Sequence, residues 1–188
     1  MNKWNNGKYI LLKGFAKNFC GFSHYQQNLE NSFVVNHING RGGSLRSVCI
    51  TNQAPVNKFL ESHRTLIEDM VSKKFKLEPV EMKTNGNMMQ FRDGIPVHND
   101  WFDLNENHHP DAIVARGILT INPTYVFGTD VYDWDAEKDE HVHRDIFGGY
   151  PGDLFIFKCT PDSWHSVGNK TERHVDRYSI NITFKIKQ

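Results

Sequence analysis

The sequence predicts a mainly β domain with supporting helices, in which two antiparallel sheets form a double-stranded β-helix, or jelly-roll barrel. Two observations lead to this prediction. After residue 78 the chain alternates short runs of apolar and polar residues with turn signals such as Asp93-Gly94 and Pro151-Gly152. Before that point, one long segment has apolar residues at three- and four-residue spacing, as in an amphipathic helix. Many short strands after one helix are typical of a barrel with helical support on one face.

The N-terminal part is predicted to support this barrel. Residues 8–15 and 45–51 are expected to be strands. Residues 17–43 have no strong period, and the INGRGG segment at 38–43 marks a loop. A helix is expected from Pro55 to about residue 75, because proline suits the first helical turn and an apolar stripe follows it. The stripe consists of Val56, Phe59, Leu60, His63, Leu66, Ile67, Met70 and Val71. We expect it to face the core, with His63 a hydrogen-bonded flanking residue rather than a ligand.

The strands of the barrel follow this helix. They are expected at 79–83, 87–92, 95–100, 114–122, 125–133, 153–158, 164–168 and 177–186. Asn85-Gly86 is predicted to be a turn, and the glycines in 84–93 leave open whether this segment is a hinged lid. We expect a single domain over 1–188, with N-terminal strands and the helix in 1–78 and the jelly-roll core in 79–188.

Composition and charge exclude several functional classes. The 188 residues carry 22 basic and 22 acidic side chains, so no broad positive field attracts nucleic acid, and a nucleic-acid partner is not expected. No apolar run approaches the 18 or so residues of a membrane span, and no signal peptide is recognisable. The three cysteines have no pairing pattern and are expected to be small core residues. A soluble, cytoplasmic location is therefore expected.

One motif carries the chemistry. His98 and Asp100 lie in the sequence IPVHND, on one side of an extended segment, and His165 follows 67 residues after His98 in WHSVGN. Two histidines and a carboxylate suit Fe(II) that keeps open positions for a chelating co-substrate and O2. Arg177 comes 12 residues after His165 and opens a strand. Its guanidinium is a natural partner for the far carboxylate of that co-substrate.

The spacing His-x-Asp is weak evidence alone, because it occurs four times: at His98/Asp100, His109/Asp111, His143/Asp145 and His174/Asp176. The second and third pairs lie in polar runs predicted to be loops. The fourth lies too close in sequence to His165, whereas His98 leaves room for several strands in between. A second metal group, formed by His141 and His143 with Asp139 or Asp145, is the weaker candidate.

The strand that begins at Arg177 alternates polar and apolar residues. Arg177, Ser179 and Asn181 fall on one face, and Tyr178 and Ile180 on the other. An ordinary antiparallel strand with one face in water has the same pattern. The proximity of His165 in the sequence favours a strand that lines a site.

These segments resemble the Fe(II)/2-oxoglutarate-dependent dioxygenases, and among them the prolyl-4-hydroxylase-like group, over about residues 87–186. RYSINITF is similar to the Arg-Tyr-x-Ile strand of the oxygen-sensing prolyl hydroxylases. The resemblance implies a cupin-like jelly roll in which His98, Asp100 and His165 are the catalytic metal ligands, on the second and seventh barrel strands. It also implies that Arg177, on the eighth strand, binds the 5-carboxylate of 2-oxoglutarate.

Further residues of the co-substrate site follow from the same resemblance. Ser179 would assist Arg177, and Asn181 lies on the same face of that strand. GILTINP resembles the strand in which prolyl hydroxylases place a tyrosine against 2-oxoglutarate. Thr120 stands at that position here, so this contact is expected to be replaced.

The resemblance implies hydroxylation of an unactivated C–H bond, with succinate and CO2 as co-products. The cofactors implied are Fe(II) and 2-oxoglutarate, and ascorbate is a further candidate. The expected substrate, besides O2, is a prolyl residue of a peptide or protein, or a small amino acid. Aromatic residues near the predicted mouth of the barrel are candidates for contacting it: Trp101, Phe102, Tyr125, Tyr132 and Trp134.

Other functions remain open. Nucleic-acid alkylation-repair oxygenases end in an Arg-x-Asn-x-Thr-Phe-Arg strand that NITFK resembles, but Ser179 and Lys185 replace the two arginines. A non-catalytic jelly-roll binding module would contain these histidines incidentally and bind no iron. A zinc hydrolase with the same ligands would need a general base, and none is evident beside them.

Overall fold

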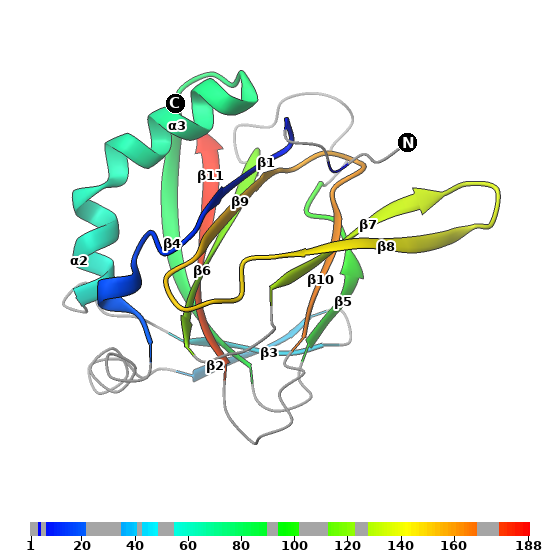
Figure 1. The fold of residues 1–188 in the computed structure, drawn as a ribbon, viewed down its shortest axis with the longest axis horizontal. Coiled ribbons are helices and arrows are strands. Elements are labelled where there is room, and N and C mark those ends of the chain that lie inside the picture. The colour runs from blue at the N-terminus through cyan, green and yellow to red at the C-terminus, as the bar shows by residue number, and fades with distance from the viewer. Residues whose placement is uncertain are drawn as a thin grey trace.

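The computed structural model describes residues 4, 7–21, 35–40, 43–48, 55–89, 94–101, 113–122, 128–168 and 177–188. Its strands form two antiparallel sheets (Figure 1). In spatial order, the major sheet contains β1 (Tyr9–Leu12), β9 (Leu154–Lys158), β6 (Ala115–Asn122), β11 (Arg177–Ile186), β4 (Val80–Met89), β3 (Gly43–Val48) and β2 (Val35–Gly40). The minor sheet contains β5 (Gly94–His98), β10 (Trp164–Gly168), β7 (Thr129–Asp135) and β8 (Glu140–Phe147).

The helices lie on one side of this arrangement. A short 3-10 helix, η1 (Lys17–Phe19), precedes α2 (Pro55–Ser62) and α3 (Arg64–Phe75), and the latter two cover the outer face of the major sheet (Figure 1). Two sheets with helices on one face confirm the predicted fold class, a mainly β jelly roll with helical support. Among the described residues, neither of these helices has the length and apolar character that a membrane span requires.

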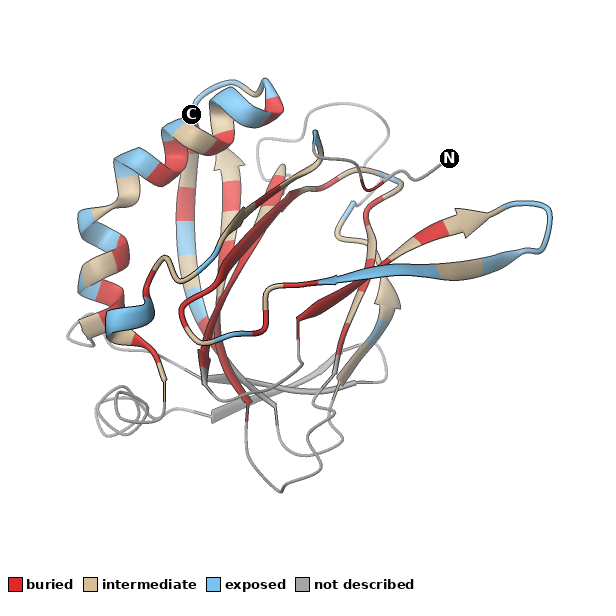
Figure 2. Cartoon of the chain, in the orientation of Figure 1, coloured by how far each residue is buried: buried red, intermediate tan, exposed pale blue. Residues whose placement is uncertain are grey.

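Apolar residues pack on both faces of the major sheet. Its outer face and the helices share a core that includes Leu60, Ile67, Val71, Leu119, Ile156, Ile180, Ile182 and Phe184. A second core lies between the two sheets and includes Ile118, Phe155 and Phe157 together with Val131, Phe147 and Val167. β9, β6 and β11 of the major sheet are therefore buried along most of their length (Figure 2). Since side chains alternate along a strand, the odd-numbered residues of β11 face the barrel interior.

The predicted helix is divided into two at His63. The backbone N–H of His63 is shared between the carbonyls of Phe59 and Leu60, at 3.2 and 3.1 Å, and its ring Nδ1 donates to Phe59 O at 2.9 Å. His63 is thus the hydrogen-bonded flanking residue that the sequence predicts. Leu66 is 61% exposed and does not belong to the buried stripe, contrary to the prediction.

The predicted turn at Asn85-Gly86 is wrong, because β4 continues through it. This strand pairs with β11 along its whole length, Gly86 opposite Ile180, and with β3 near its C-terminal end. Hydrogen bonding to strands on both sides outweighs the local turn preference of these two residues. Residues 84–89 therefore belong to the sheet rather than to a lid, and residues 90–93 lie outside the described part of the chain.

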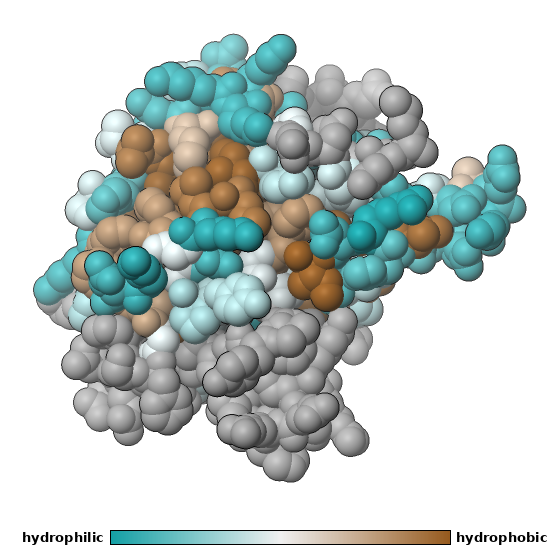
Figure 3. Space-filling model, viewed as in Figure 1, coloured by the Kyte–Doolittle hydropathy of each residue, from teal (hydrophilic) through white to brown (hydrophobic). Residues whose placement is uncertain are grey.

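Two further strands were not predicted from the sequence. β8 has the charged sequence EHVHRDIF, and it forms the edge of the minor sheet, paired with β7. An edge strand that water reaches carries charged residues, which removes the alternation that identifies a strand in a sequence. β2 lies in the stretch 17–43, which shows no strong period, and its last three residues belong to the segment predicted to be a loop; it pairs with β3. The β7–β8 hairpin projects from the barrel (Figure 1), and its surface is mostly hydrophilic (Figure 3).

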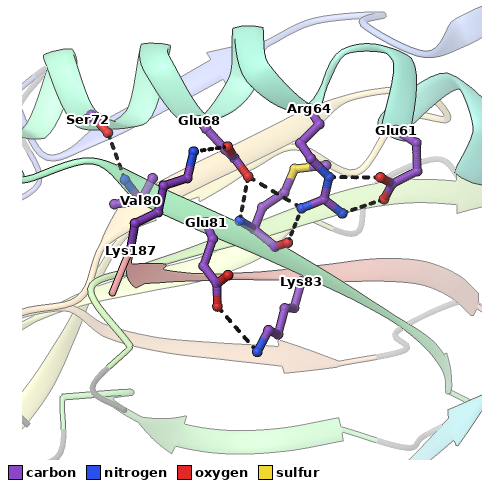
Figure 4. A network of polar contacts seen from close by, with 9 residues as sticks. Glu61, Arg64, Glu68, Ser72, Val80, Glu81, Lys83 and Lys187 are labelled. Atoms are coloured by element: carbon purple, nitrogen blue, oxygen red, sulfur yellow. Dashed lines mark hydrogen bonds and ion pairs between the residues drawn. The ribbon is translucent and has the colours of Figure 1, made fainter. Parts of the chain in front are cut away.

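A polar network fixes α3 to the edge of β4 (Figure 4). Glu68 is 5% exposed, and its carboxylate accepts hydrogen bonds from Met82 N–H at 2.9 Å and from Lys187 Nζ at 2.9 Å. Arg64 donates to Met82 O and to Glu68. β3 pairs with β4 only around Gly86, so the side chains of α3 satisfy the backbone of Met82 in place of a strand. Burial alone would raise the pKa of Glu68, but the hydrogen bonds from Lys187 and Met82 N–H lower it.

Replacing Glu68 is expected to weaken this attachment. Glu68→Ala leaves Met82 N–H without an acceptor and should reduce the free energy of unfolding by about 2–3 kcal/mol. Glu81→Ala is the matched control, since Glu81 pairs with Lys83 in a more exposed ion pair on the same strand and should cost less than about 1 kcal/mol. Urea denaturation measures both. Equal losses in the two variants would contradict this role of Glu68.

Candidate metal centre and co-substrate site

The pairing of β5 with β10 brings the two predicted histidine ligands together. In the antiparallel register His98 lies opposite His165, and their ring centroids are 4.2 Å apart. Asp100 follows two residues after His98. Its Oδ1 is 3.8 Å from His98 Nε2, and its Oδ2 is 3.6 Å from His165 Nε2. All three ligand atoms lie within 4.8 Å of one another, and no other such group of three occurs among the described residues.

Backbone hydrogen bonds orient both imidazole rings. His98 Nδ1 lies 2.8 Å from Pro96 O, and His165 Nδ1 lies 2.9 Å from Ser163 O. Only an Nδ1–H can donate to a carbonyl, so each Nε2 carries the lone pair. Metal-binding histidines in proteins are fixed in this way, with one nitrogen bonded to a carbonyl and the other directed at the ion. The group is therefore a suitable ligand set for a divalent metal ion.

The electrostatics of the group favour ligand forms without protons. Burial alone would raise the pKa of Asp100, but the positive charge of Arg116 and a hydrogen bond from it hold that pKa below its usual range. Arg116 Nε donates to Asp100 Oδ2 at 2.9 Å. Burial lowers the pKa of His165 to about 4, an effect that the nearby Asp100 only partly offsets. At neutral pH the pair consists of a carboxylate and a neutral imidazole, the forms that bind metal.

The predicted co-substrate residues lie on the inward face of the major sheet. Arg177 begins β11, is 2% exposed, and shares a face with Ser179 and Asn181. Thr120, on β6, lies directly opposite Ser179 in the register and is 2% exposed. Burial lowers the pKa of Arg177 to about 10, although the carboxylate of Asp130 raises it, so the guanidinium remains charged at neutral pH. A buried cation at this position is suited to binding a carboxylate.

Two residues of the site were not predicted from the sequence. Arg116 contacts Asp100, and Asp130, which is 4% exposed, is the carboxylate whose charge acts on Arg177. Arg116 could have been found, since it lies two strand positions from Ile118 and four from Thr120 in a largely apolar strand. Asp130 has no comparable signal, because it is one of many acidic residues in the segment that forms β7 and β8.

The alternative metal residues are not gathered into a ligand group. His143 Nε2 lies 3.0 Å from Asp130 Oδ1, and Asp145 is exposed. His141 packs against the rings of Trp134 and Trp164, at centroid distances of 4.8 and 4.5 Å. The other two pairs with His-x-Asp spacing, His109/Asp111 and His174/Asp176, lie outside the described residues.

The aromatic candidates for substrate contact are only partly described. Trp101 is 40% exposed and follows Asp100 directly. Tyr132 bonds to Ser166 through its hydroxyl at 3.0 Å, and Trp134 belongs to the aromatic cluster around His141. Phe102 and Tyr125 lie outside the described residues. Trp101 is therefore the one exposed aromatic residue next to a candidate ligand among those described.

Comparison with known proteins identifies the fold. No protein-family model and no curated protein matches the sequence. Among solved structures, a prolyl-4-hydroxylase from Pseudomonas putida superimposes with a TM-score of 0.62 at 12% identity, over 96% of this chain and 94% of that one. This chain has the jelly-roll fold of that enzyme.

Two further structures show the range of that fold. A Trichoplax adhaerens prolyl hydroxylase, in complex with a peptide fragment of hypoxia inducible factor, gives a TM-score of 0.60 at 14% identity, over 98% of this chain and 86% of that one. The α-ketoglutarate-dependent epimerase SnoN from nogalamycin biosynthesis gives 0.61 at 12% identity, over 95% and 76%. The 2-oxoglutarate oxygenase fold is thus common to enzymes with different reactions.

The low pKa of His165 predicts how the stability of the metal-free protein depends on pH. The unfolded chain protonates this histidine near pH 6.5, whereas the folded chain keeps it neutral down to about pH 4. Between these values the unfolded state binds more protons. The stability that comes from the neutral His165 is complete above pH 6.5 and decreases as the pH falls, by at most about 1.4 kcal/mol per pH unit.

His165→Gln should remove this contribution. Denaturant unfolding of the metal-free proteins at pH 7 and pH 5 measures it, and the variant should lose less stability over this interval than the wild type. Equal losses in the two proteins would show that His165 does not resist protonation in the folded state.

Proposed function

We propose that this protein is an Fe(II)- and 2-oxoglutarate-dependent dioxygenase that hydroxylates an unactivated C–H bond. The observation that carries the proposal is the group His98, Asp100 and His165, whose ligand atoms lie within 4.8 Å of one another, with both Nδ1 atoms bonded to backbone carbonyls. Fe(II) chelated by 2-oxoglutarate activates O2 for hydroxylation, with succinate and CO2 as co-products. Two histidines and one carboxylate leave coordination positions for both molecules.

The co-substrate is proposed to extend from this centre toward Arg177. The Arg177 guanidinium binds the 5-carboxylate, and Ser179, Asn181 and Thr120 line the polar strip beside it. Thr183 supports this position, because it lies on the same face of β11 as Arg177 and bonds to Arg116, the partner of Asp100. One inward face thus connects the metal ligands with the buried arginine. Arg177 is 2% exposed, and its burial in this region strengthens the ionic contact.

We propose a prolyl residue of a peptide or protein, or a small amino acid, as the substrate. Two of the compared structures are prolyl hydroxylases, and one of them holds a peptide. Trp101 supports a prolyl substrate. It directly follows Asp100 in the sequence, and its exposed ring offers a flat apolar surface to a pyrrolidine ring. The epimerase with the same fold is the reason to test the reaction outcome separately from the cofactors.

An anaerobic titration with Fe(II) and 2-oxoglutarate tests the cofactor site. The wild type should develop the weak visible charge-transfer band of chelated 2-oxoglutarate. His165→Ala should abolish it, and Arg177→Ala should require at least about tenfold more 2-oxoglutarate, because a charge-assisted bond to the carboxylate is lost.

Two variants outside the site control for the removal of a histidine or an arginine. His63→Gln changes a residue at the junction of α2 and α3, and Arg144→Ala changes an exposed residue of β8. Both should leave the titration unchanged. A wild type that binds no iron would contradict the proposal and favour a non-catalytic binding module. Binding of zinc in strong preference to iron, without any effect of 2-oxoglutarate, would favour a hydrolase.

The substrate class is tested by oxygen transfer. Incubation with Fe(II), 2-oxoglutarate, ascorbate and isotopically labelled O2 should add one labelled oxygen atom to proline-containing peptides or to free amino acids, as read by mass spectrometry. Succinate should form in equal amount. Succinate formation without labelling of any of these compounds would leave the oxygenase in place and contradict the proposed substrate.

A further inference from the structure

Arg116 is a charged residue inside the barrel, next to a candidate metal ligand. Its Nε donates to Asp100 Oδ2 at 2.9 Å, and its Nη1 donates to Thr183 Oγ1 at 2.8 Å. In the sheet it lies between Phe157 of β9 and Thr183 of β11. We propose that Arg116 is a positioning residue that engages one oxygen of Asp100 and leaves the other to the metal ion. This inference rests on the proposed Fe(II) site.

The contacts of Asp100 show why such a residue is needed. Oδ1 lies 3.8 Å from His98 Nε2, and Oδ2 lies 3.6 Å from His165 Nε2, so each oxygen has an imidazole nitrogen near it. Without Arg116, the carboxylate could give the ion either oxygen or both. Arg116 occupies Oδ2, whereas Oδ1 receives no hydrogen bond from the described residues. A carboxylate that binds through one oxygen leaves an additional coordination position for co-substrate or O2.

The second contact of Arg116 fixes its orientation. A guanidinium is planar, so bonds from two of its nitrogens to groups on different strands define both its position and its plane. Thr183 is on β11 and Asp100 follows β5, and Arg116 therefore connects the major sheet to the minor sheet at the metal ligands. Lysine has one terminal donor atom on a flexible stem and cannot reproduce this geometry.

The matched control is a second arginine–aspartate pair away from the ligands. Arg144 Nε donates to Asp133 Oδ2 at 2.8 Å, and Asp133 is 5% exposed, so the bond resembles that of Arg116 in type and length. This pair connects β8 to β7, whereas the candidate ligands lie on β5, just after it, and on β10. Arg144→Gln therefore removes a comparable ion pair without changing the ligand group.

The test is a titration of the metal-free proteins with Co(II), a spectroscopic probe for Fe(II), followed by visible absorbance. The unfolding midpoint of each variant is measured alongside. Arg116→Gln should weaken Co(II) binding by about 10–100-fold, the usual effect of removing a residue that orients a ligand. Arg116→Lys should also weaken it, and Thr183→Val should do so by a smaller factor. The spectrum of the Co(II) complex should change in both Arg116 variants, because the coordination by Asp100 changes. Arg144→Gln should keep wild-type affinity and spectrum.

The outcomes separate this inference from the proposed function. Wild-type Co(II) affinity and spectrum in Arg116→Gln would overturn the inference, whatever that variant does to the unfolding midpoint. If Arg116→Gln does not fold, wild-type affinity and spectrum in both Arg116→Lys and Thr183→Val would overturn it. A wild-type protein that binds neither Co(II) nor Fe(II) would instead overturn the proposed metal site itself.

Discussion

The antiparallel pairing of β5 with β10 is the constraint on which the site depends. It places His98 directly opposite His165, although 67 residues separate them in the sequence. A shift of the register by one residue would turn one histidine to the other face of the sheet. The extended chain after β5 then brings Asp100 to both Nε2 atoms. The group thus results from backbone hydrogen bonding, and the apolar residues between the two sheets hold that backbone in place.

Burial of charge inside the barrel follows a consistent pattern. Each charge of the site has an opposite charge near it: the half-buried Arg116 and Asp100 bond to each other, and the carboxylate of Asp130 acts on the buried Arg177. A buried ion without a partner would cost several kcal/mol, so these pairs let the barrel contain ligands and binding groups in an apolar surrounding. The two pairs differ in the group that remains able to bind a ligand. Asp100 has one oxygen without a hydrogen bond among the described residues, and Arg177 remains a cation that can bind a second carboxylate.

The sequence predicted the residues whose positions follow from strand periodicity. The strands at 164–168 and 177–186 have the predicted bounds, and alternation alone placed Arg177 and Ser179 on one face. It failed where tertiary pairing decides the structure. Gly86 lies in a strand because β11 and β3 bind both its edges, and β8 is charged because it forms an edge. Arg116 stands out as a charge in an apolar strand, but its partners could not be predicted, because only the folded barrel brings Thr183 and Asp100 to it.

In the proposed site, His98, Asp100 and His165 bind one metal ion together with 2-oxoglutarate directed at Arg177. The most direct measurement is a crystal structure of the protein grown anaerobically with Mn(II), a redox-stable substitute for Fe(II), and 2-oxoglutarate, with anomalous data collected at the manganese edge. We expect a single anomalous peak coordinated by both Nε2 atoms and one oxygen of Asp100, with the distal carboxylate of 2-oxoglutarate on Arg177. A manganese peak at another site, or 2-oxoglutarate bound away from Arg177, would contradict the proposed metal and co-substrate site.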